Sequence, residues 1–380
     1  MSGATPPRDI KVVGDVSEQF EAVRDVFVRC LAALPEGGAA FAVYASGRKV
    51  VDLTGGSFSE DTLAQVFSVS KAVTAVAVAH AVEHGRLDVD VPLAQYWPEF
   101  HHAGRDAITP RMVLGHSAGL PAVTEPLTKE DLLTGGLEAA ISRQEPIWEP
   151  GTAHGYGAFT FGALLDGAFS RQLDCTVAEY VAEHITGPAE LDVWYGLPED
   201  RKSRSVPTRF VPPVVTPAAL AAHEAGIAIQ DGSFAAVVAD PAAFFRDPDV
   251  QRAQWPAMSV VATARSLAKL AAQTVGTVDG VRLLHDKGLA HLVTPTSVGW
   301  DRVLLQRTKW AGGVELARPQ LPLLGRESFG HPGAGGSVLA ADPCRNVGAA
   351  FTTDTAMPDL GASEWATVLL TAVDRCLDDA

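Results

Sequence analysis

The run from Ala72 to Val82, AVTAVAVAHAV, constrains the fold more than any other part of the sequence. Its residues are apolar at nearly every position, so a helix built from them has no polar face. Such a helix is buried on every side and therefore belongs in the core. Gly85 follows it at a position where glycine commonly ends a helix.

Composition limits the class of protein. The chain has 380 residues, of which 47% are hydrophobic and 20% charged, which is typical of a well-buried globular protein. Its net charge of −15 argues against nucleic acid or an anionic membrane as a partner. The first residues lack the pattern of a secretory signal, and no apolar run is long enough to span a membrane.

The four cysteines, Cys30, Cys175, Cys344 and Cys376, are widely scattered. Their spacing fits neither a zinc site nor a redox pair. We expect reduced, mostly buried thiols in a cytoplasmic protein that needs no metal or cofactor.

Strand patterns occur near both ends of the chain. Residues 37–56, GGAAFAVYASGRKVVDLTGG, predict two strands joined by a turn at 46–48. Three further strand-like segments lie within 302–355, and helices are expected at 16–34 and at the C-terminus. The strand–helix alternation that an α/β-hydrolase needs is missing.

These patterns predict an α/β (α+β) fold with one antiparallel sheet of five or more strands. The first and last helices would cover one face of the sheet, and the buried helix the other. Residues 1–86 and 262–380 would form this discontinuous sheet domain. Residues 87–261, with short helical patterns and Pro-rich connections, would form an inserted, mostly helical lobe.

Residues 115–119, GHSAG, match the G-x-S-x-G nucleophile elbow of α/β-hydrolases. In that elbow the serine follows a buried strand and opens a helix. Here Thr109 and Pro110 predict a short helix before the motif, and Pro121 disfavours a helix after it. We interpret the motif as a tight turn and do not expect Ser117 to be a nucleophile.

The pattern S-x-x-K occurs three times, beginning at Ser46, Ser68 and Ser266. The first lies in the predicted hairpin turn, and the third lies inside an amphipathic helix. Only the second opens the buried helix, which places Ser68 and Lys71 one turn apart on one face. Free N–H groups at the helix N-terminus would also face a developing oxyanion. From these residues alone, Ser68 is either a nucleophile or a simple helix cap.

A lysine that acts as a base needs a lowered pKa. Free lysine titrates near ~10.4, and reaching about 7 means destabilising the ammonium by about 4–5 kcal/mol. An apolar helix end can supply that destabilisation. Lys71 is therefore a candidate base for Ser68.

Four segments support the nucleophile interpretation by their order: FSVSK (67–71), HSAGLP (116–121), EPGTAHGYGAFTFGALL (149–165) and FGHPGAGG (329–336). Together they resemble the motifs of the serine β-lactamase and penicillin-binding-protein superfamily. The resemblance is greatest to the family VIII carboxylesterases, which are similar to class C β-lactamases. It runs from about residue 37 to residue 354.

The resemblance implies that Ser68 is acylated and that Lys71 is its hydrogen-bonded base partner. Tyr156 stands where the family has its catalytic tyrosine. Its phenol would relay the proton to the leaving alkoxide and later activate the deacylating water. A lysine and a tyrosine this close should titrate as a unit. The alternative for Tyr156 is a core aromatic residue with a satisfied hydroxyl.

The third motif of β-lactamases is Lys-Thr-Gly on an edge strand beside the nucleophile. The matching residues here are His331, Pro332 and Gly333. The resemblance implies that substrate lies along this strand and that the Ala334 N–H completes an oxyanion hole with the Ser68 N–H. The lack of a side chain at Gly333 would permit the close approach. His331 is expected on the substrate side, and a plain strand-edge histidine is the alternative.

Departures from the family pattern bear on function. The third-motif lysine is replaced by a largely neutral histidine, and Gly157 and Ala158 replace polar side chains in the second motif. These changes weaken anion recognition, so we predict a serine carboxylesterase acting on small or medium esters through an acyl-enzyme. An acyltransferase is the alternative, followed by a β-lactamase or DD-peptidase and, last, a binding protein. The expected partner is a small-molecule ester, without nucleic acid or membrane, and the oligomeric state is open.

Overall fold

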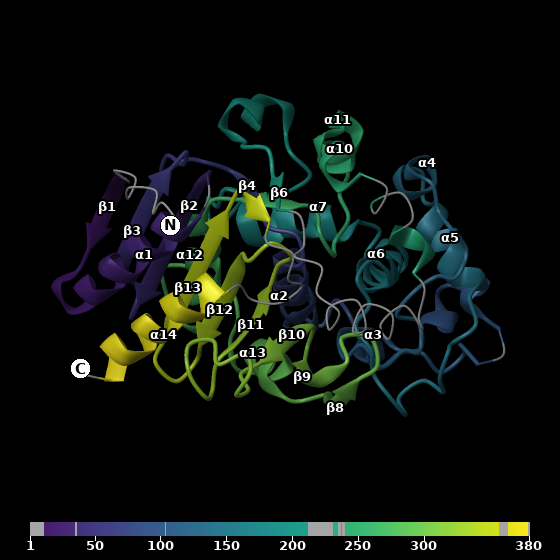
Figure 1. The fold of residues 1–380 in the computed structure, drawn as a ribbon. Helices are drawn as coiled ribbons and strands as arrows, with labels where there is room; N and C mark the ends of the chain where they lie inside the picture. Colours follow the sequence, from purple (N-terminus) through teal and green to yellow (C-terminus); the bar gives the residue numbers. More distant parts are fainter. Residues whose placement is uncertain are drawn as a thin grey trace.

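The protein is described by a computed structural model that covers residues 11–34, 36–102, 104–211, 231–234, 237, 240–356 and 364–378. Its centre is a nine-stranded antiparallel sheet in the order β1-β3-β2-β13-β12-β11-β10-β9-β8 (Figure 1). Strands from the two ends of the chain meet where β13 pairs with β2. This confirms the predicted α/β (α+β) fold.

The large sheet contains β1 (Val12–Val16), β2 (Gly38–Ala45), β3 (Arg48–Gly56), β8 (Ser297–Asp301), β9 (Gln306–Ala311), β10 (Val314–Leu316), β11 (Phe329–Pro332), β12 (Val338–Asp342) and β13 (Val347–Thr353). One small sheet contains β4 (Ala64–Gln65), β5 (Val193–Tyr195) and β7 (Val260–Ala262), and another contains β6 (Arg209–Phe210) and β14 (Thr355–Ala356).

The longer helices are α1 (Glu21–Ala33), α2 (Val69–Glu83), α6 (Thr160–Gln172), α12 (Ala264–Val275) and α14 (Glu364–Asp378). The shorter α-helices are α3 (Pro110–Leu114), α4 (Lys129–Leu133), α5 (Gly136–Arg143), α7 (Val177–Val181), α10 (Pro241–Arg246), α11 (Pro248–Arg252) and α13 (Asp286–Val293). The 3₁₀ and π segments are η1 (Glu18–Phe20), η2 (Leu93–Gln95), η3 (Pro98–Phe100), η4 (Ala182–Thr186), η5 (Glu199–Arg204) and η6 (Gly232–Phe234).

Helices cover the two faces of the large sheet as predicted. α1 and α14 pack together on one face, where Phe27 and Val373 share a core with Phe41 of β2. α2 and α12 lie on the other face and belong to a second, larger core (Figure 1). Twelve of the fifteen residues of α2 are buried, which confirms the helix without a polar face. The second face therefore carries the start of α2, with Ser68 at its N-cap.

Local turn signals are also confirmed. Ser46 and Gly47 join β2 to β3 with φ values of +48° and +79°, as a two-residue hairpin turn with both residues left-handed requires. Gly85 follows α2 with φ +65°. The helix expected from residue 16 begins later, because residues 12–16 form β1 and pair with β3 instead.

The segment between α2 and α12 holds most of the short helices and the strands β5 and β6. Its division from the sheet domain at 86/87 and 261/262 stays a prediction. Part of that segment, including 212–230, lies outside the described residues. Among the residues that are described, no helix is both long and apolar enough to cross a bilayer.

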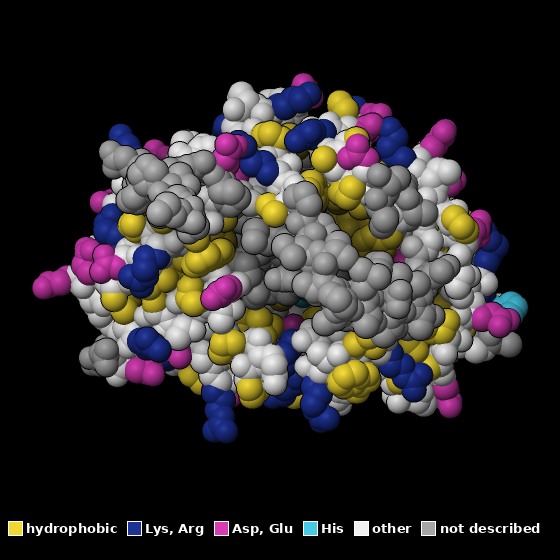
Figure 2. All heavy atoms as spheres, in the orientation of Figure 1, with side chains coloured by type: hydrophobic (Ala, Val, Ile, Leu, Met, Phe, Trp, Pro, Cys, Tyr) yellow, Lys and Arg dark blue, Asp and Glu magenta, His cyan; other side chains and the backbone are white. Residues whose placement is uncertain are grey.

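One face of the molecule is shown in Figure 2. Acidic and basic side chains are interspersed over the described residues there, and no broad basic patch is visible. Hydrophobic side chains gather toward the middle of the same face.

Candidate active site

Ser68 stands at the N-cap of α2 after a strained residue. Phe67 has φ +48°, which is uncommon for a bulky side chain. The conformation is held because the Ser70 hydroxyl donates to the Phe67 carbonyl at 2.5 Å, and because the Phe67 ring packs edge-on against Phe245 at 5.1 Å. Backbone strain of this kind clusters at functional sites.

Lys71 is fully buried, and its surroundings suit a neutral amine. Nζ donates to the carbonyl oxygens of Ala158 at 2.9 Å and Ala257 at 3.1 Å. It also lies 3.3 Å from Ser68 Oγ. Burial holds the pKa of Lys71 well below its usual range. A neutral amine has two N–H groups and one lone pair, so the two carbonyls leave the lone pair for the serine proton.

Tyr156 completes the group on the other side of the serine. Its hydroxyl donates to Ser68 Oγ at 2.8 Å, and its ring centroid lies 4.8 Å from Lys71 Nζ. Burial raises the pKa of Tyr156, and the carboxylates of Glu315 and Asp301 raise it further. The structure thus brings together the three side chains singled out in the sequence.

The other two S-x-x-K patterns have ordinary surface roles. Lys49, in the β2–β3 hairpin, pairs with Asp52 at 2.5 Å. Lys269, in α12, pairs with Asp279 at 2.7 Å. Neither amine approaches the serine of its own pattern.

The third motif lies against the start of α2. A Cβ on Gly333 would lie 2.2 Å from the Val66 carbonyl oxygen, so only glycine permits this approach. Among the described residues, the amides of Ser68 and Ala334 donate no hydrogen bond to protein. Both N–H groups are therefore available to an oxyanion.

The strand that carries this motif differs from the expected edge strand. β11 lies between β10 and β12. Its pairing with β10 includes Phe329 and Gly330 but not His331, so that side of the strand is free from residue 331 onward. β11 therefore has a short unpaired edge from residue 331 onward, although the strand lies inside the sheet.

His331 is almost fully buried, whereas a residue that lines an open substrate site would be more exposed to solvent. Its side chain is 2% exposed, and its ring lies 6.0 Å from that of Tyr156. Nδ1 donates to the Pro332 carbonyl at 2.6 Å, which leaves Nε2 without a partner among the described residues. Burial lowers the pKa of His331 to about 3, so the imidazole is neutral at neutral pH. Its contact with a substrate stays a prediction.

The GHSAG segment is a turn that follows a helix, as interpreted. Thr109 caps α3 by accepting from the Met112 amide, and Pro110 is its first residue. Ser117 is 8% exposed and donates to the Met112 carbonyl at 3.3 Å. No strand precedes it, so the nucleophile-elbow geometry is absent.

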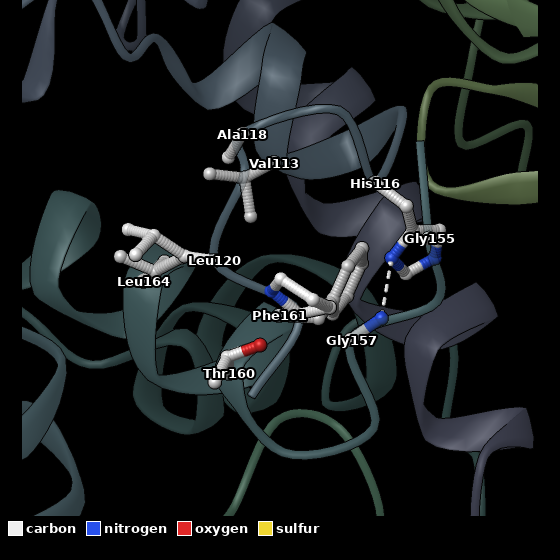
Figure 3. A pocket seen from close by; sticks show the side chains of 10 residues that line it. Val113, His116, Ala118, Leu120, Gly155, Gly157, Thr160, Phe161 and Leu164 are labelled. Atoms are coloured by element: carbon white, nitrogen blue, oxygen red, sulfur yellow. Dashed lines mark hydrogen bonds between the residues drawn. The ribbon is translucent and has the colours of Figure 1, made fainter. Parts of the chain in front are cut away.

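His116, in that turn, was not singled out from the sequence, although its ring lies 5.0 Å from that of Tyr156. It has φ +54°, and its Nδ1 accepts the Gly157 N–H at 3.1 Å (Figure 3). A small pocket with room for about one water molecule lies beside it, lined mainly by apolar side chains from α3, the turn and α6. The lining does not include Ser68, Lys71 or Tyr156, so the pocket is not where the reaction occurs.

Asp301 is the second residue that the sequence did not reveal. It ends β8 and is fully buried. Its Oδ1 accepts N–H groups from Tyr156 at 3.1 Å, Val303 at 2.9 Å and Leu304 at 2.8 Å. A single aspartate in a strand-like segment gives no signal of a contact across 145 positions.

The sequence matches the beta-lactamase family over residues 27–373. The chain belongs to this family. This match and the related proteins described below support the assignment of the chain as a serine hydrolase. They also confirm the resemblance inferred from the motifs. Among the described residues of this beta-lactamase-family protein, no group of three His, Cys, Asp or Glu side chains could hold a metal ion.

Solved structures of related proteins are close in fold. A family VIII carboxylesterase superposes with a TM-score of 0.85 at 28% identity, over 96% of this chain and 100% of that one. A penicillin-binding-protein homologue from Caulobacter crescentus gives a TM-score of 0.82 at 32% identity, with the same coverage. The esterase/beta-lactamase LipL of Mycobacterium tuberculosis is 29% identical over 91% of this chain and 83% of its own length.

Proposed function

We propose that this beta-lactamase-family protein is a carboxylesterase that hydrolyses small to medium neutral esters through an acyl-enzyme on Ser68. The observation that carries the proposal is the position of Ser68 Oγ, 3.3 Å from Lys71 Nζ and 2.8 Å from the Tyr156 hydroxyl. Burial favours the neutral form of both partners, because it lowers the pKa of the amine and raises that of the phenol.

Acylation follows from these positions. Ser68 Oγ attacks the ester carbonyl carbon and passes its proton to the lone pair of Lys71. The carbonyl oxygen becomes an oxyanion that accepts from the N–H groups of Ser68 and Ala334. When the C–O bond breaks, the Tyr156 hydroxyl protonates the leaving alkoxide and recovers a proton from the Lys71 ammonium. Water then replaces the alcohol, and the same steps run in reverse order to release the acid.

The charge of the site supports a neutral substrate. The position that holds lysine in β-lactamases holds His331, whose low pKa of about 3 keeps it uncharged. Gly157 and Ala158 add no polar side chain to the second motif. A carboxylate on a β-lactam would find no cation from these residues. Cys30 and Cys376 are buried, whereas Cys175 is half-buried and Cys344 is exposed, so only part of the expected burial of the thiols is seen. The cytoplasmic location remains a proposal from the sequence.

The proposal is tested by comparing substrates on the purified protein. We expect rapid hydrolysis of p-nitrophenyl butyrate and much slower turnover of nitrocefin. Added alcohol should divert only a minor part of the acyl group to a new ester, because water reaches the acyl-enzyme. Rapid nitrocefin turnover without ester cleavage would make the protein a β-lactamase, and predominant transfer to alcohol would make it an acyltransferase.

Activity should depend on pH through the lysine. Because the base must be neutral, kcat/KM should fall as the pH drops through the lowered pKa of Lys71 and should be constant between that pKa and the alkaline loss. The raised pKa of Tyr156 keeps the phenol protonated, so the alkaline loss should lie above the ordinary tyrosine value near ~10. A kcat/KM profile with butyrate ester checks both limbs. A profile that rises toward acid pH would contradict a neutral lysine base.

If the Ala334 N–H is part of the oxyanion hole, adding a methyl group at the neighbouring Gly333 should cause a large loss of activity. In Gly333→Ala the new Cβ would meet the Val66 carbonyl oxygen, which is backbone and cannot rotate away. The segment bearing Ala334 must then move, and we expect kcat to fall about 10²-fold, as for the loss of one oxyanion donor. Gly276→Ala is the matched control, since its Cβ meets only ordinary contacts at 3.5 Å. Equal activity of the two variants would contradict the assignment.

A further inference from the structure

Tyr156 lies on a stretch without helix or strand, between the end of α5 and the start of α6. Such a segment does not by itself fix a side chain. The phenol nevertheless has to meet Ser68 Oγ at hydrogen-bond distance for the proposed chemistry. Something outside the segment must therefore hold it.

We propose that Asp301 and His116 are positioning residues that fix the catalytic tyrosine by holding two consecutive backbone amides, those of Tyr156 and Gly157. This inference rests on the proposed function, because it assigns these two residues to the reaction through Tyr156. Neither side chain touches Ser68 or Lys71 through a hydrogen bond.

Asp301 supplies the first anchor from β8. Its Oδ1 accepts the Val303 and Leu304 amides, which closes the turn after the strand, and accepts the Tyr156 amide as well. The carboxylate is fully buried and has no cationic partner within 4 Å among the described residues. A buried charge without a cation is costly unless several N–H groups compensate it. The three N–H groups on Oδ1 offset only part of this cost, since Oδ2 is buried without a partner among the described residues.

His116 supplies the second anchor from the turn after α3. The Gly157 N–H donates to Nδ1, so Nδ1 carries no proton and the neutral ring carries it on Nε2. The ring also packs on Tyr156 at 5.0 Å and on Trp310 at 4.4 Å. Figure 3 shows the imidazole directed at the Gly157 amide. This contact gives the GHSAG turn a role that its serine does not have.

Two adjacent anchors restrict the loop that carries Tyr156 more than a single anchor would. The amides of Tyr156 and Gly157 belong to the two peptide planes on either side of the Tyr156 Cα. Holding both amides restricts rotation about that Cα and therefore the direction of the Tyr156 side chain. The anchors come from sequence positions 145 and 41 residues away, on opposite sides of the loop in the chain. The loop is thereby tied to β8 and to α3 together. A small displacement of a reacting group can cost about 10²-fold in rate.

The test is a double-mutant cycle with the tyrosine. Asp301→Ala and His116→Ala remove an anchor, and each is made alone and in a Tyr156→Phe background. With p-nitrophenyl butyrate, we expect each single variant to lower kcat about 30- to 100-fold with little change in KM. In the Tyr156→Phe background we expect less than about 3-fold further loss, because residues that act through one group are not additive.

Conservative variants separate positioning from charge. Asn at position 116 retains an acceptor near the place of Nδ1 and tolerates positive φ. His116→Asn should therefore recover most of the activity lost in His116→Ala. Asp301→Asn retains the acceptor oxygen but removes the negative charge, which is one cause of the raised pKa of Tyr156. Its kcat should recover, while the alkaline limb of its pH profile should move to lower pH.

Asp342 provides a matched control. It is 2% exposed, and its Oδ1 accepts the Cys344 and Arg345 amides in the same turn arrangement, far from the tyrosine loop in the sequence. Asp342→Ala should lower the melting temperature, and any activity loss should be the same with Tyr156 or Phe at position 156. If the Asp301 and His116 variants show that same additive behaviour, or lose no activity, the positioning role is wrong.

Failure of the proposed function is recognised separately. If the wild-type protein hydrolyses no ester, the esterase proposal fails, and the same cycle is then measured by the rate at which a fluorophosphonate labels Ser68. Non-additive loss of labelling would support the two anchors, and additive loss would overturn them.

Discussion

Replacing Ser68 with alanine is expected to reduce kcat for ester hydrolysis by about 10⁴-fold or more, without lowering the melting temperature appreciably. The large loss follows because Lys71 and Tyr156 both act on Ser68 Oγ, and removing the nucleophile leaves neither with a reaction to assist. Stability should change little, since the Ser68 side chain makes no capping hydrogen bond and the half-buried Oγ loses only its contacts with Tyr156 and Lys71. Initial rates and a thermal melt measure the two quantities.

Ser117→Ala is the control for this prediction. Ser117 sits in the GHSAG motif, so an enzyme with an α/β-hydrolase mechanism would lose activity on its removal. Here its hydroxyl only donates to the Met112 carbonyl, so we expect kcat within about 3-fold of wild type. Mass spectrometry after fluorophosphonate treatment should place the label on Ser68. A label on Ser117 would refute the proposed mechanism.

Sequence patterns located the nucleophile because its context is local. The apolar run that follows Ser68 distinguishes it from Ser46 and Ser266, and twelve of the fifteen residues of α2 are buried in the structure. Tyr156 carried no local signal and was reached through the order of motifs in a known family. The hairpin at Ser46 and Gly47 could also be predicted from the sequence, because its turn needs two residues that adopt positive φ.

The missed features depend on contacts between distant segments. No strand was predicted at β1, and residue 16 was assigned to the helix; β1 is a strand because β3 offers it an edge. Asp301 reads as one more polar residue at a strand end, and its role appears only when β8 meets the tyrosine loop. His116 was not predicted because the G-x-S-x-G pattern indicates its neighbour, Ser117, as the candidate side chain. Burial of His331 likewise depends on Trp310 and Tyr156, which lie far from it in the sequence.

Lys71→Met is expected to lower kcat about 10³-fold or more, because Ser68 then has no base and methionine has no titratable group. Methionine is similar in length and fits a buried site, so the variant should still fold. Steady-state kinetics with butyrate ester measures the loss. Activity within about 10-fold of wild type would show that Tyr156 alone can serve as the base.

The same variant should reveal the protonation state of the lysine through the pH dependence of stability. In the unfolded chain lysine is protonated below ~10.4, whereas burial lowers the pKa of Lys71 in the folded protein. The folded state therefore binds fewer protons, and each unit of falling pH costs the wild type about 1.36 kcal/mol until the folded-state pKa is reached. Lys71→Met does not incur this cost.

Thermal melts of the two proteins across a pH series should therefore diverge toward acid pH and converge toward alkaline pH. The loss of two N–H donors to Ala158 and Ala257 costs about 1 kcal/mol each and shifts the curves by a constant amount. The slope of the difference reports Lys71 together with the groups whose pKa its charge affects, which are His116, His331 and the coupled Tyr156. Parallel curves between neutral and alkaline pH would mean that Lys71 stays an ammonium in the folded state. Such an ammonium could not accept the Ser68 proton.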